Sequence, residues 1–107
     1  MRNLVDLLYK VSISETIGST KVEVNNIQFD SRKVSNDDVF VAVYGVTVDG
    51  HQYIEKAIGL GAKAIVCEVL PENLVDGITY VKVENSTIAL GILASNFYGN
   101  PTTDLKL

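Results

Sequence analysis

Small polar side chains stand at both ends of one apolar run in the segment FDSRKVSNDDVFVAVYGVTVDGH, residues 29–51. Asp30, Ser31 and Arg32 come before the run, and a glycine-flanked stretch, residues 45–51, comes after it. Hydroxyl, guanidinium and backbone N–H groups are the donors with which proteins bind phosphate. The pattern therefore predicts that the two turns together hold one phosphorylated ligand.

The first turn allows a functional and a structural interpretation. As a ligand site, it offers the Ser31 hydroxyl to a phosphate or ribose oxygen and the Arg32 guanidinium as a charged fork. In the structural alternative, Asp30 forms a local Asx-turn, and Arg32 pairs with Asp30 or lies on the surface. The residue types leave both interpretations open.

The second turn also has two interpretations. We expect it at the C-terminal end of a buried strand, the edge where ligands collect in open α/β sheets. N–H groups at the start of a helix over residues 50–60 would attract a phosphate, but Asp49 as the N-cap would occupy some of them. Neither G-x-G-x-x-G nor G-x-x-x-x-G-K-[ST] occurs in the chain. A dinucleotide fingerprint and a nucleoside-triphosphate P-loop are therefore excluded.

The residue types predict no catalytic or metal-binding constellation. His51 is the single histidine and Cys67 the single cysteine, whereas a metal site requires several such ligands. A lone histidine near a helix start is more often solvated or locally bonded than catalytic. We expect Cys67, which follows Ile65 and Val66, to be an inert part of the core.

Composition limits the function classes further. The 107 residues suit one domain spanning residues 1–107. The net charge of −4 argues against nucleic acid or an anionic membrane surface as a partner. Asp6 and Lys10 interrupt any apolar N-terminal run, which argues against a signal peptide. No apolar stretch approaches the roughly 20 residues of a membrane span, and the single cysteine is typical of the cytoplasm.

Hydrophobic periodicity predicts an N-terminal helix followed by irregular and extended segments. Apolar residues recur at helical spacing from Leu4 to Val11. Residues 12–21, rich in Ser, Thr and Gly, are expected to form a loop. One or two short strands are expected within residues 21–32, where valines alternate with polar residues.

Three β-favouring runs predict the body of a sheet. They are residues 39–43, 62–69 and 79–83. Asp49 is positioned to cap a helix that Gly59 and Gly61 end, and this helix connects the first two runs in a parallel βαβ unit.

A second helix is expected after the third strand, capped by Asn85 or Ser86 and ended by Gly99 and Pro101. The fold class is therefore α/β, with a small mixed or parallel sheet and flanking helices.

Four sequence blocks over residues 29–68 occur in an order that is specific. They are D-S-R, V-F-V-A, G-x-x-x-D-G-x-x-Y-I and A-I-x-x-G-A-x-A-I-V. With these four blocks in this order, the chain resembles the N-terminal domain of the Mur ligases of peptidoglycan synthesis. The tail LASNFYGNPTTDLKL resembles the segment before the ATP-binding domain in the MurE type, which adds the third amino acid of the peptide.

The resemblance implies that this domain grips the UDP part of UDP-N-acetylmuramoyl-L-alanyl-D-glutamate. Carried over by position, the contacts are Phe29 and Ser31 at the first turn and Val46, Thr47 and Val48 at the second. No catalytic and no metal-binding residue is implied in this chain. The family's Pro-Gly-Asp turn is replaced here by Asn-Asp-Asp, and Asn tolerates the same turn geometry.

The resemblance also implies a larger parent enzyme. Its central domain would hold ATP and Mg²⁺, its last domain would recognise the incoming amino acid, and this chain alone would be inactive. It leaves open which amino acid the parent adds, its oligomeric state and whether this domain binds substrate measurably by itself. Two alternatives remain at this point: the first domain of a MurF-type ligase, and a non-catalytic nucleotide-binding or interaction module of similar architecture.

Overall fold

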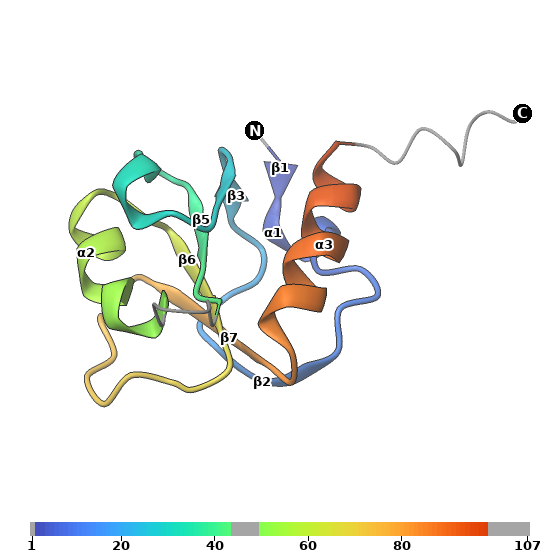
Figure 1. Ribbon diagram of the computed structural model, residues 1–107. Coiled ribbons are helices and arrows are strands. Elements are labelled where there is room, and N and C mark those ends of the chain that lie inside the picture. The colour runs from blue at the N-terminus through green and yellow to red at the C-terminus, as the bar shows by residue number, and fades with distance from the viewer. Residues whose placement is uncertain (1, 44–49, 99–107) are drawn as a thin grey trace, which may run out of the picture.

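The structure, a computed structural model, describes residues 2–43 and 50–98 of the chain. Its centre is a five-stranded sheet in the order β2-β7-β6-β5-β4 (Figure 1). Four neighbouring strands are parallel, and β2 joins the edge of β7 in the antiparallel direction. The strands are β2 (Ile13–Ile17), β4 (Ile27–Gln28), β5 (Val39–Val41), β6 (Ala64–Cys67) and β7 (Thr79–Val83). The predicted mixed sheet with flanking helices is confirmed.

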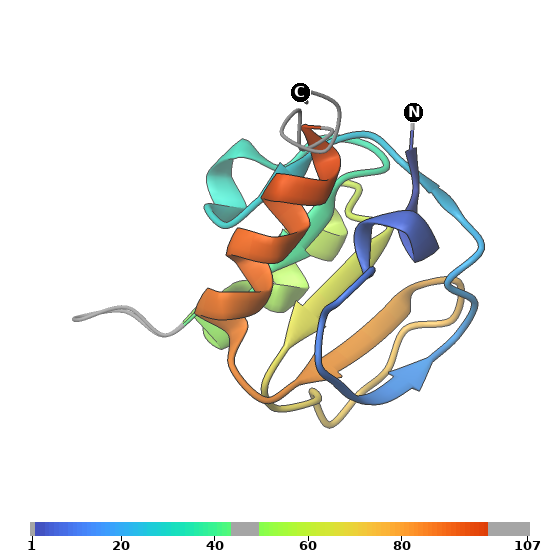
Figure 2. The same ribbon diagram turned by 90° about the vertical axis from the view of Figure 1, so that its right-hand side faces the viewer.

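Alternation along the central strands gives the sheet two apolar faces, as a period of two requires. Phe40 and Ile65 belong to a cluster with residues of α2 (Ile54–Gly59). Val41 and Val66 belong to a cluster with residues of α1 (Leu4–Leu7) and α3 (Ser86–Phe97). Figure 1 shows these helices on opposite sides of the sheet, and Figure 2 looks onto the α1 and α3 side. The molecule therefore has three layers.

The predicted βαβ unit is present, although its helix begins later than expected. A 3₁₀ turn, η2 (Gly50–Tyr53), precedes α2, and no side chain caps the first turn of α2. The predicted cap, Asp49, lies outside the described residues. The helix ends as expected at Gly59, and Gly61 has φ +113, a conformation that residues with a Cβ rarely adopt.

The helix α3 matches its prediction at its start. The Asn85 side chain accepts a hydrogen bond from the Ile88 N–H at 3.0 Å, as an N-cap does. The Glu68 carboxylate accepts hydrogen bonds from the Ser86 N–H at 2.7 Å and from the Ser86 hydroxyl at 2.8 Å. Glu68 directly follows β6, so these bonds connect the start of α3 to the end of that strand. The predicted stop at Gly99 and Pro101 lies outside the described residues.

The N-terminal predictions were wrong in two places. The first helix ends at Leu7 instead of continuing to Val11, and Lys10 takes φ 70 in the turn that follows. The expected loop over residues 12–21 contains the edge strand β2, whose side chains are almost all exposed. One or two short strands were expected within residues 21–32, and the structure has two, β3 (Glu23–Val24) and β4; β3 pairs with β1 (Arg2–Asn3) in a separate ladder.

Within the described residues, none of the helices combines the length and the apolar character that a membrane crossing requires.

Candidate functional site

The first predicted turn follows β4 and forms the 3₁₀ turn η1 (Ser31–Lys33). Asp30 caps it, because its Oδ1 accepts a hydrogen bond from the Arg32 N–H at 3.0 Å. The same carboxylate takes a fork from the Arg32 guanidinium, with Nε to Oδ1 at 3.1 Å and Nη2 to Oδ2 at 2.9 Å. Asp30 therefore forms the Asx-turn and also occupies Arg32.

This ion pair changes the acidity of both groups. Hydrogen bonds from the Arg32 side chain and N–H lower the pKa of Asp30 from 3.8 to about 2. The side-chain hydrogen bond to Asp30 in turn raises the pKa of Arg32. The turn consequently carries a fixed pair of charges, with the exposed Arg32 side chain and Lys33 on its outer side.

Ser31 and Phe29 take contrasting positions at this turn. Ser31 is 7% exposed and Phe29 is 61% exposed. The Ser31 hydroxyl has no hydrogen-bond partner within the described part of the chain. Ser31 is one of the buried polar residues in the described part of the chain. Its role as a donor to a ligand stays a prediction.

The strands that precede the two predicted turns end at the same edge of the sheet. The strands β4 and β5 are parallel neighbours, with Ile27 opposite Val39 and Gln28 opposite Phe40. The turn after β4 carries Ser31, and the chain after β5 leads to residues 46–48. Val46, Thr47 and Val48 themselves lie outside the described residues, so their contact with a ligand stays a prediction.

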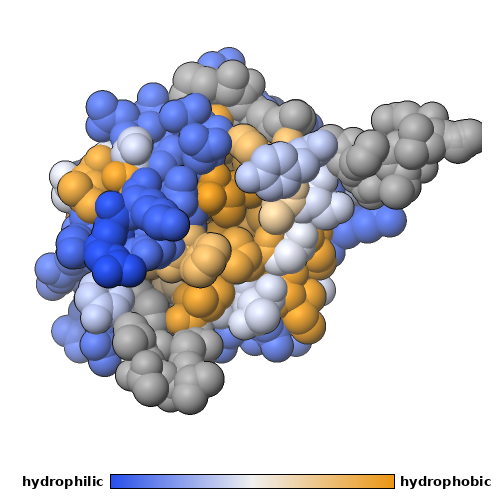
Figure 3. Space-filling view, turned by 45° about the horizontal axis from the view of Figure 1, so that its top comes forward, coloured by the Kyte–Doolittle hydropathy of each residue, from blue (hydrophilic) through white to orange (hydrophobic). Residues whose placement is uncertain are grey.

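The surface between the helical layers is apolar in part. Figure 3 shows a strip of apolar side chains between a hydrophilic flank on the side of α2 and η1 and the side of α3. Apolar surface open to solvent in this amount is commonly covered by a ligand or by another part of a protein.

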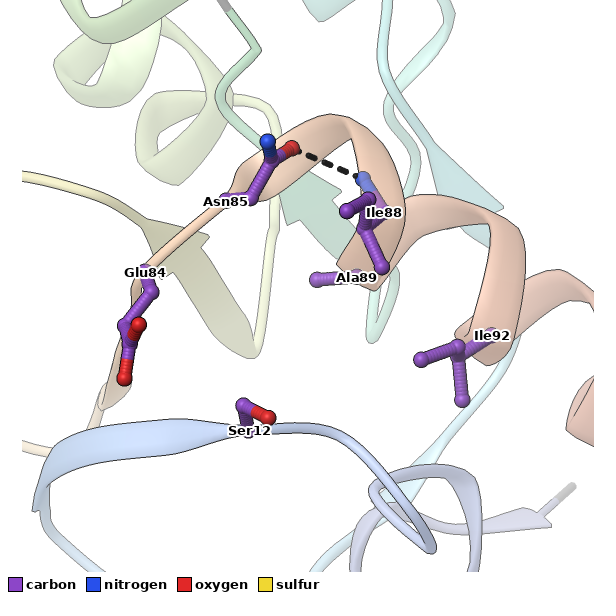
Figure 4. A pocket seen from close by; sticks show the side chains of 6 residues that line it. All are labelled: Ser12, Glu84, Asn85, Ile88, Ala89 and Ile92. Carbon is purple, nitrogen blue, oxygen red and sulfur yellow. Dashed lines mark hydrogen bonds between the residues drawn. The ribbon is translucent and has the colours of Figure 1, made fainter.

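A pocket elsewhere does not suit a phosphate. It measures about 150 Å³ and lies at the start of α3 against the beginning of β2 (Figure 4). Its lining residues are Ser12, Glu84, Asn85, Ile88, Ala89 and Ile92. The Glu84 carboxylate would repel an anion, and the Asn85 oxygen is occupied by the cap of α3.

Cys67 lies in the core, as expected. Cys67 is fully buried in the α2-side cluster, and burial raises the pKa of its thiol to about 11. No group of three or more metal-ligating side chains occurs among the residues that the structure describes. His51 belongs to η2.

Sequence reasoning missed one buried residue at the opposite, amino-terminal ends of β4 and β5. Asp38 is 1% exposed, and its carboxylate accepts hydrogen bonds from the Asn26 N–H at 3.0 Å and the Ser35 N–H at 2.8 Å. The only signal in the sequence is an acidic residue directly before a buried strand, and this is common in surface turns too.

Relatives of known name are similar to this chain over almost its whole length. A UDP-N-acetylmuramoyl-L-alanyl-D-glutamate–2,6-diaminopimelate ligase of Cytophaga hutchinsonii is 50% identical over 103 residues, which are 95% of this chain and 21% of that protein. A ligase with the same name in Phocaeicola vulgatus is 43% identical over 104 residues, which are 97% of this chain and 22% of that protein. The chain thus spans about a fifth of the length of these relatives.

Solved structures share the fold. The MurF ligase of Thermotoga maritima, in complex with ADP, matches 72% of this chain and 17% of its own with a TM-score of 0.60 and 38% identity. MurF of Acinetobacter baumannii matches 88% of this chain and 20% of its own with a TM-score of 0.73 and 21% identity, which supports the fold alone.

The sequence profile described as "Mur ligase family, catalytic domain" matches residues 23–98. This range takes in both predicted turns and the strands that carry them. Because it is well over half of the 107 residues, the chain belongs to the Mur ligase family.

Proposed function

We propose that this chain is the UDP-binding first domain of a peptidoglycan ligase of the MurE type. Its ligand is the nucleotide part of UDP-N-acetylmuramoyl-L-alanyl-D-glutamate, the substrate in the names of the relatives at 43% and 50% identity. Those names favour diaminopimelate as the amino acid that the parent protein adds. Residues 1–107 form one domain, and the parent works in the cytoplasm, where UDP-linked precursors are made available to it.

One observation carries the proposal. The parallel pairing of β4 with β5 brings the carboxyl ends of both strands to one edge of the sheet, and Ser31 follows β4 in the first turn. Lys33 beside it supplies positive charge that favours a diphosphate, whereas the charge of Arg32 is balanced by Asp30. The exposed ring of Phe29 offers an apolar wall, while Thr47 and the backbone of Val46 and Val48 complete the grip.

The remaining steps of ligation belong to other parts of the parent protein. ATP and Mg²⁺ would activate the terminal carboxylate of the peptide as an acyl phosphate in a central domain, and a last domain would present the amine. The ADP complex of the Thermotoga maritima relative is consistent with that assignment. This chain holds one end of the substrate and does not itself ligate.

A titration of the chain with UDP tests the proposal. We expect chemical-shift changes at residues 29–33 in ¹⁵N spectra and saturable, weak binding. Replacement of Ser31 by Ala removes one hydrogen bond to a charged acceptor, worth about 1.5–3 kcal/mol, so UDP affinity should fall by about tenfold or more.

Ser35→Ala is the matched control, because it deletes an exposed hydroxyl four residues further along the same segment. It should leave UDP affinity unchanged. Equal affinities for wild type and Ser31→Ala would remove Ser31 from the site, and shifts far from residues 29–33 would overturn the proposed site as a whole.

A MurF-type parent is the second candidate, and the Thermotoga maritima MurF structure at 38% identity favours it. That match covers 72% of the chain, whereas the diaminopimelate ligases match 95–97% at higher identity. The parent protein decides between them: a MurE type consumes the UDP-linked dipeptide and a free amino acid, and a MurF type consumes the tripeptide and a dipeptide.

A further inference from the structure

The turn that carries Ser31 is held at its base by one buried carboxylate. Asn26 precedes β4 and Ser35 follows η1, so the two residues mark the beginning and the end of the excursion. The Asp38 Oδ1 accepts the N–H of Asn26 at 3.0 Å, and its Oδ2 accepts the N–H of Ser35 at 2.8 Å. A single side chain therefore closes both ends of residues 27–34.

The other contacts of this excursion are the short β4–β5 ladder, the packing of η1 against α2 and the apolar contacts of Ile27 and Val34. The strand β4 has only two residue pairs with β5 and lies at the edge of the sheet. Val34, at 6% exposure, packs into the cluster that also contains Phe40 and residues of α2, and it anchors the far side of the turn. Because a two-pair ladder positions a chain weakly, the placement of η1 depends on the carboxylate at its base.

Asp38 is itself fixed to the centre of the sheet. Its backbone oxygen accepts a hydrogen bond from the Lys63 N–H at 2.8 Å, at the entry to β6. The preceding residue, Asp37, accepts from the Asn25 N–H at 2.7 Å and donates to the Gly61 oxygen at 2.8 Å. Because the Asp38 backbone is fixed to β5 and β6, its carboxylate holds the two ends of the turn segment at a fixed place relative to these strands.

We propose that Asp38 is a positioning residue for ligand binding: it sets the place of the Ser31 hydroxyl at the sheet edge without touching the ligand. This inference rests on the proposed function for its ligand, UDP. A carboxylate accepts two N–H donors at once, whereas a carboxamide of the same shape has one acceptor and one donor. Asp38→Asn therefore sets its own N–H against one of the two backbone N–H groups.

The experiment compares wild type with Asp38→Asn by UDP titration and by amide hydrogen exchange of residues 30–34. We expect faster exchange in the turn and UDP affinity lower by about fivefold, the effect of misplacing one hydrogen bond of average strength. Asp37→Asn is the matched control, since it removes the same charge one residue earlier from a half-buried side chain. It should change neither quantity.

A double-mutant cycle with Ser31→Ala separates positioning from general loosening of the fold. If Asp38 acts through Ser31, Asp38→Asn lowers affinity in the wild type but not in the Ser31→Ala background. Equal losses in both backgrounds, or unchanged exchange at residues 30–34, overturn the inference. Asp38→Ser, which is too short to reach both N–H groups, replaces the Asn variant in the cycle if that variant does not fold.

The proposed function fails in a different way. If wild type shows no UDP binding, the proposed function is overturned together with the ligand role of Asp38, whatever the exchange rates are. If wild type binds and the cycle is additive, UDP binding stands and only the role of Asp38 is lost.

Discussion

Asp30 and Arg32 make the most directly measurable electrostatic contact of the site. The pKa of Asp30 is about 2 in the folded chain, against an ordinary value of 3.8. A lowered pKa means that the ion pair stabilises the fold fully above the ordinary value, and that this contribution is lost as the pH falls through about 2. We expect the side-chain carboxyl carbon of Asp30 to titrate near pH 2 in NMR spectra.

Arg32→Ala should raise that midpoint toward 3.8 without reaching it, because the N–H of residue 32 continues to donate to Asp30. Lys33→Ala is the control, since Lys33 is the smallest of the causes that lower the pKa. A wild-type midpoint near 3.8 would contradict the fork between Asp30 and Arg32.

The residue-scale predictions from sequence were limited by competition between equivalent partners. Asp30 can accept hydrogen bonds from Arg32 within one local turn, and the Arg32 guanidinium can bind either Asp30 or a phosphate. The residue types alone therefore do not decide which pair forms. The buried carboxylate of Asp38 was missed for another reason. Its burial depends on the return of the chain from η1 to β5, and its two donors lie 12 and three residues away in sequence.

At the scale of elements, Gly61 lies in the turn that connects α2 to β6. Its φ of +113 is strained for any other residue, and an added Cβ would lie 2.8 Å from the Asn36 Cα and also meet the Asn36 side-chain oxygen. We expect Gly61→Ala to lower the free energy of unfolding by about 3 kcal/mol, since backbone strain and overpacking add. Urea denaturation followed by circular dichroism measures this.

Gly77→Ala is the comparison that separates the two costs. Gly77 also has a positive φ, of +87, but an added Cβ there would have no atom within 4 Å. Its replacement should therefore cost only the backbone term, about 1–2 kcal/mol. A Gly61→Ala variant no less stable than Gly77→Ala would show that Asn36 can move away freely.

Element prediction succeeded where one apolar period dominated and failed where packing was absent. The strands β5, β6 and β7 and the helix α3 carry enough buried residues to define their type and approximate limits. The strand β2 carries polar side chains that are nearly all exposed, so its pairing with β7 supplies the structure that its own pattern does not indicate. In α1, the helical spacing continues to Val11, but the chain must turn after Leu8 to reach β2.

At the scale of the whole molecule, the sheet is the part shared by both apolar layers. Each central strand gives alternate residues to the α2 side and to the α1 and α3 side. The site depends on this arrangement, because β4 and η1 are held between Asp38 at one end and Val34 in the α2-side cluster. Loss of either layer should therefore release the turn that carries Ser31.

Two core variants test whether the layers unfold together. Ile65 and Leu93 are fully buried in the α2-side and α3-side clusters respectively. Truncation of either to Ala should lower the free energy of unfolding by about 2–5 kcal/mol. Ile88→Ala is the matched control on α3, because Ile88 is 61% exposed and should contribute within about 0.5 kcal/mol.

Shared strands also predict one cooperative transition in every variant, with an unchanged dependence on urea concentration. Circular dichroism and amide signals from both faces of the sheet should report the same midpoint. A biphasic curve, or a variant that loses protection on one face only, would mean that the layers are independent. In that case the Ser31 turn would depend on the α2 side alone, and Leu93→Ala would leave UDP binding intact.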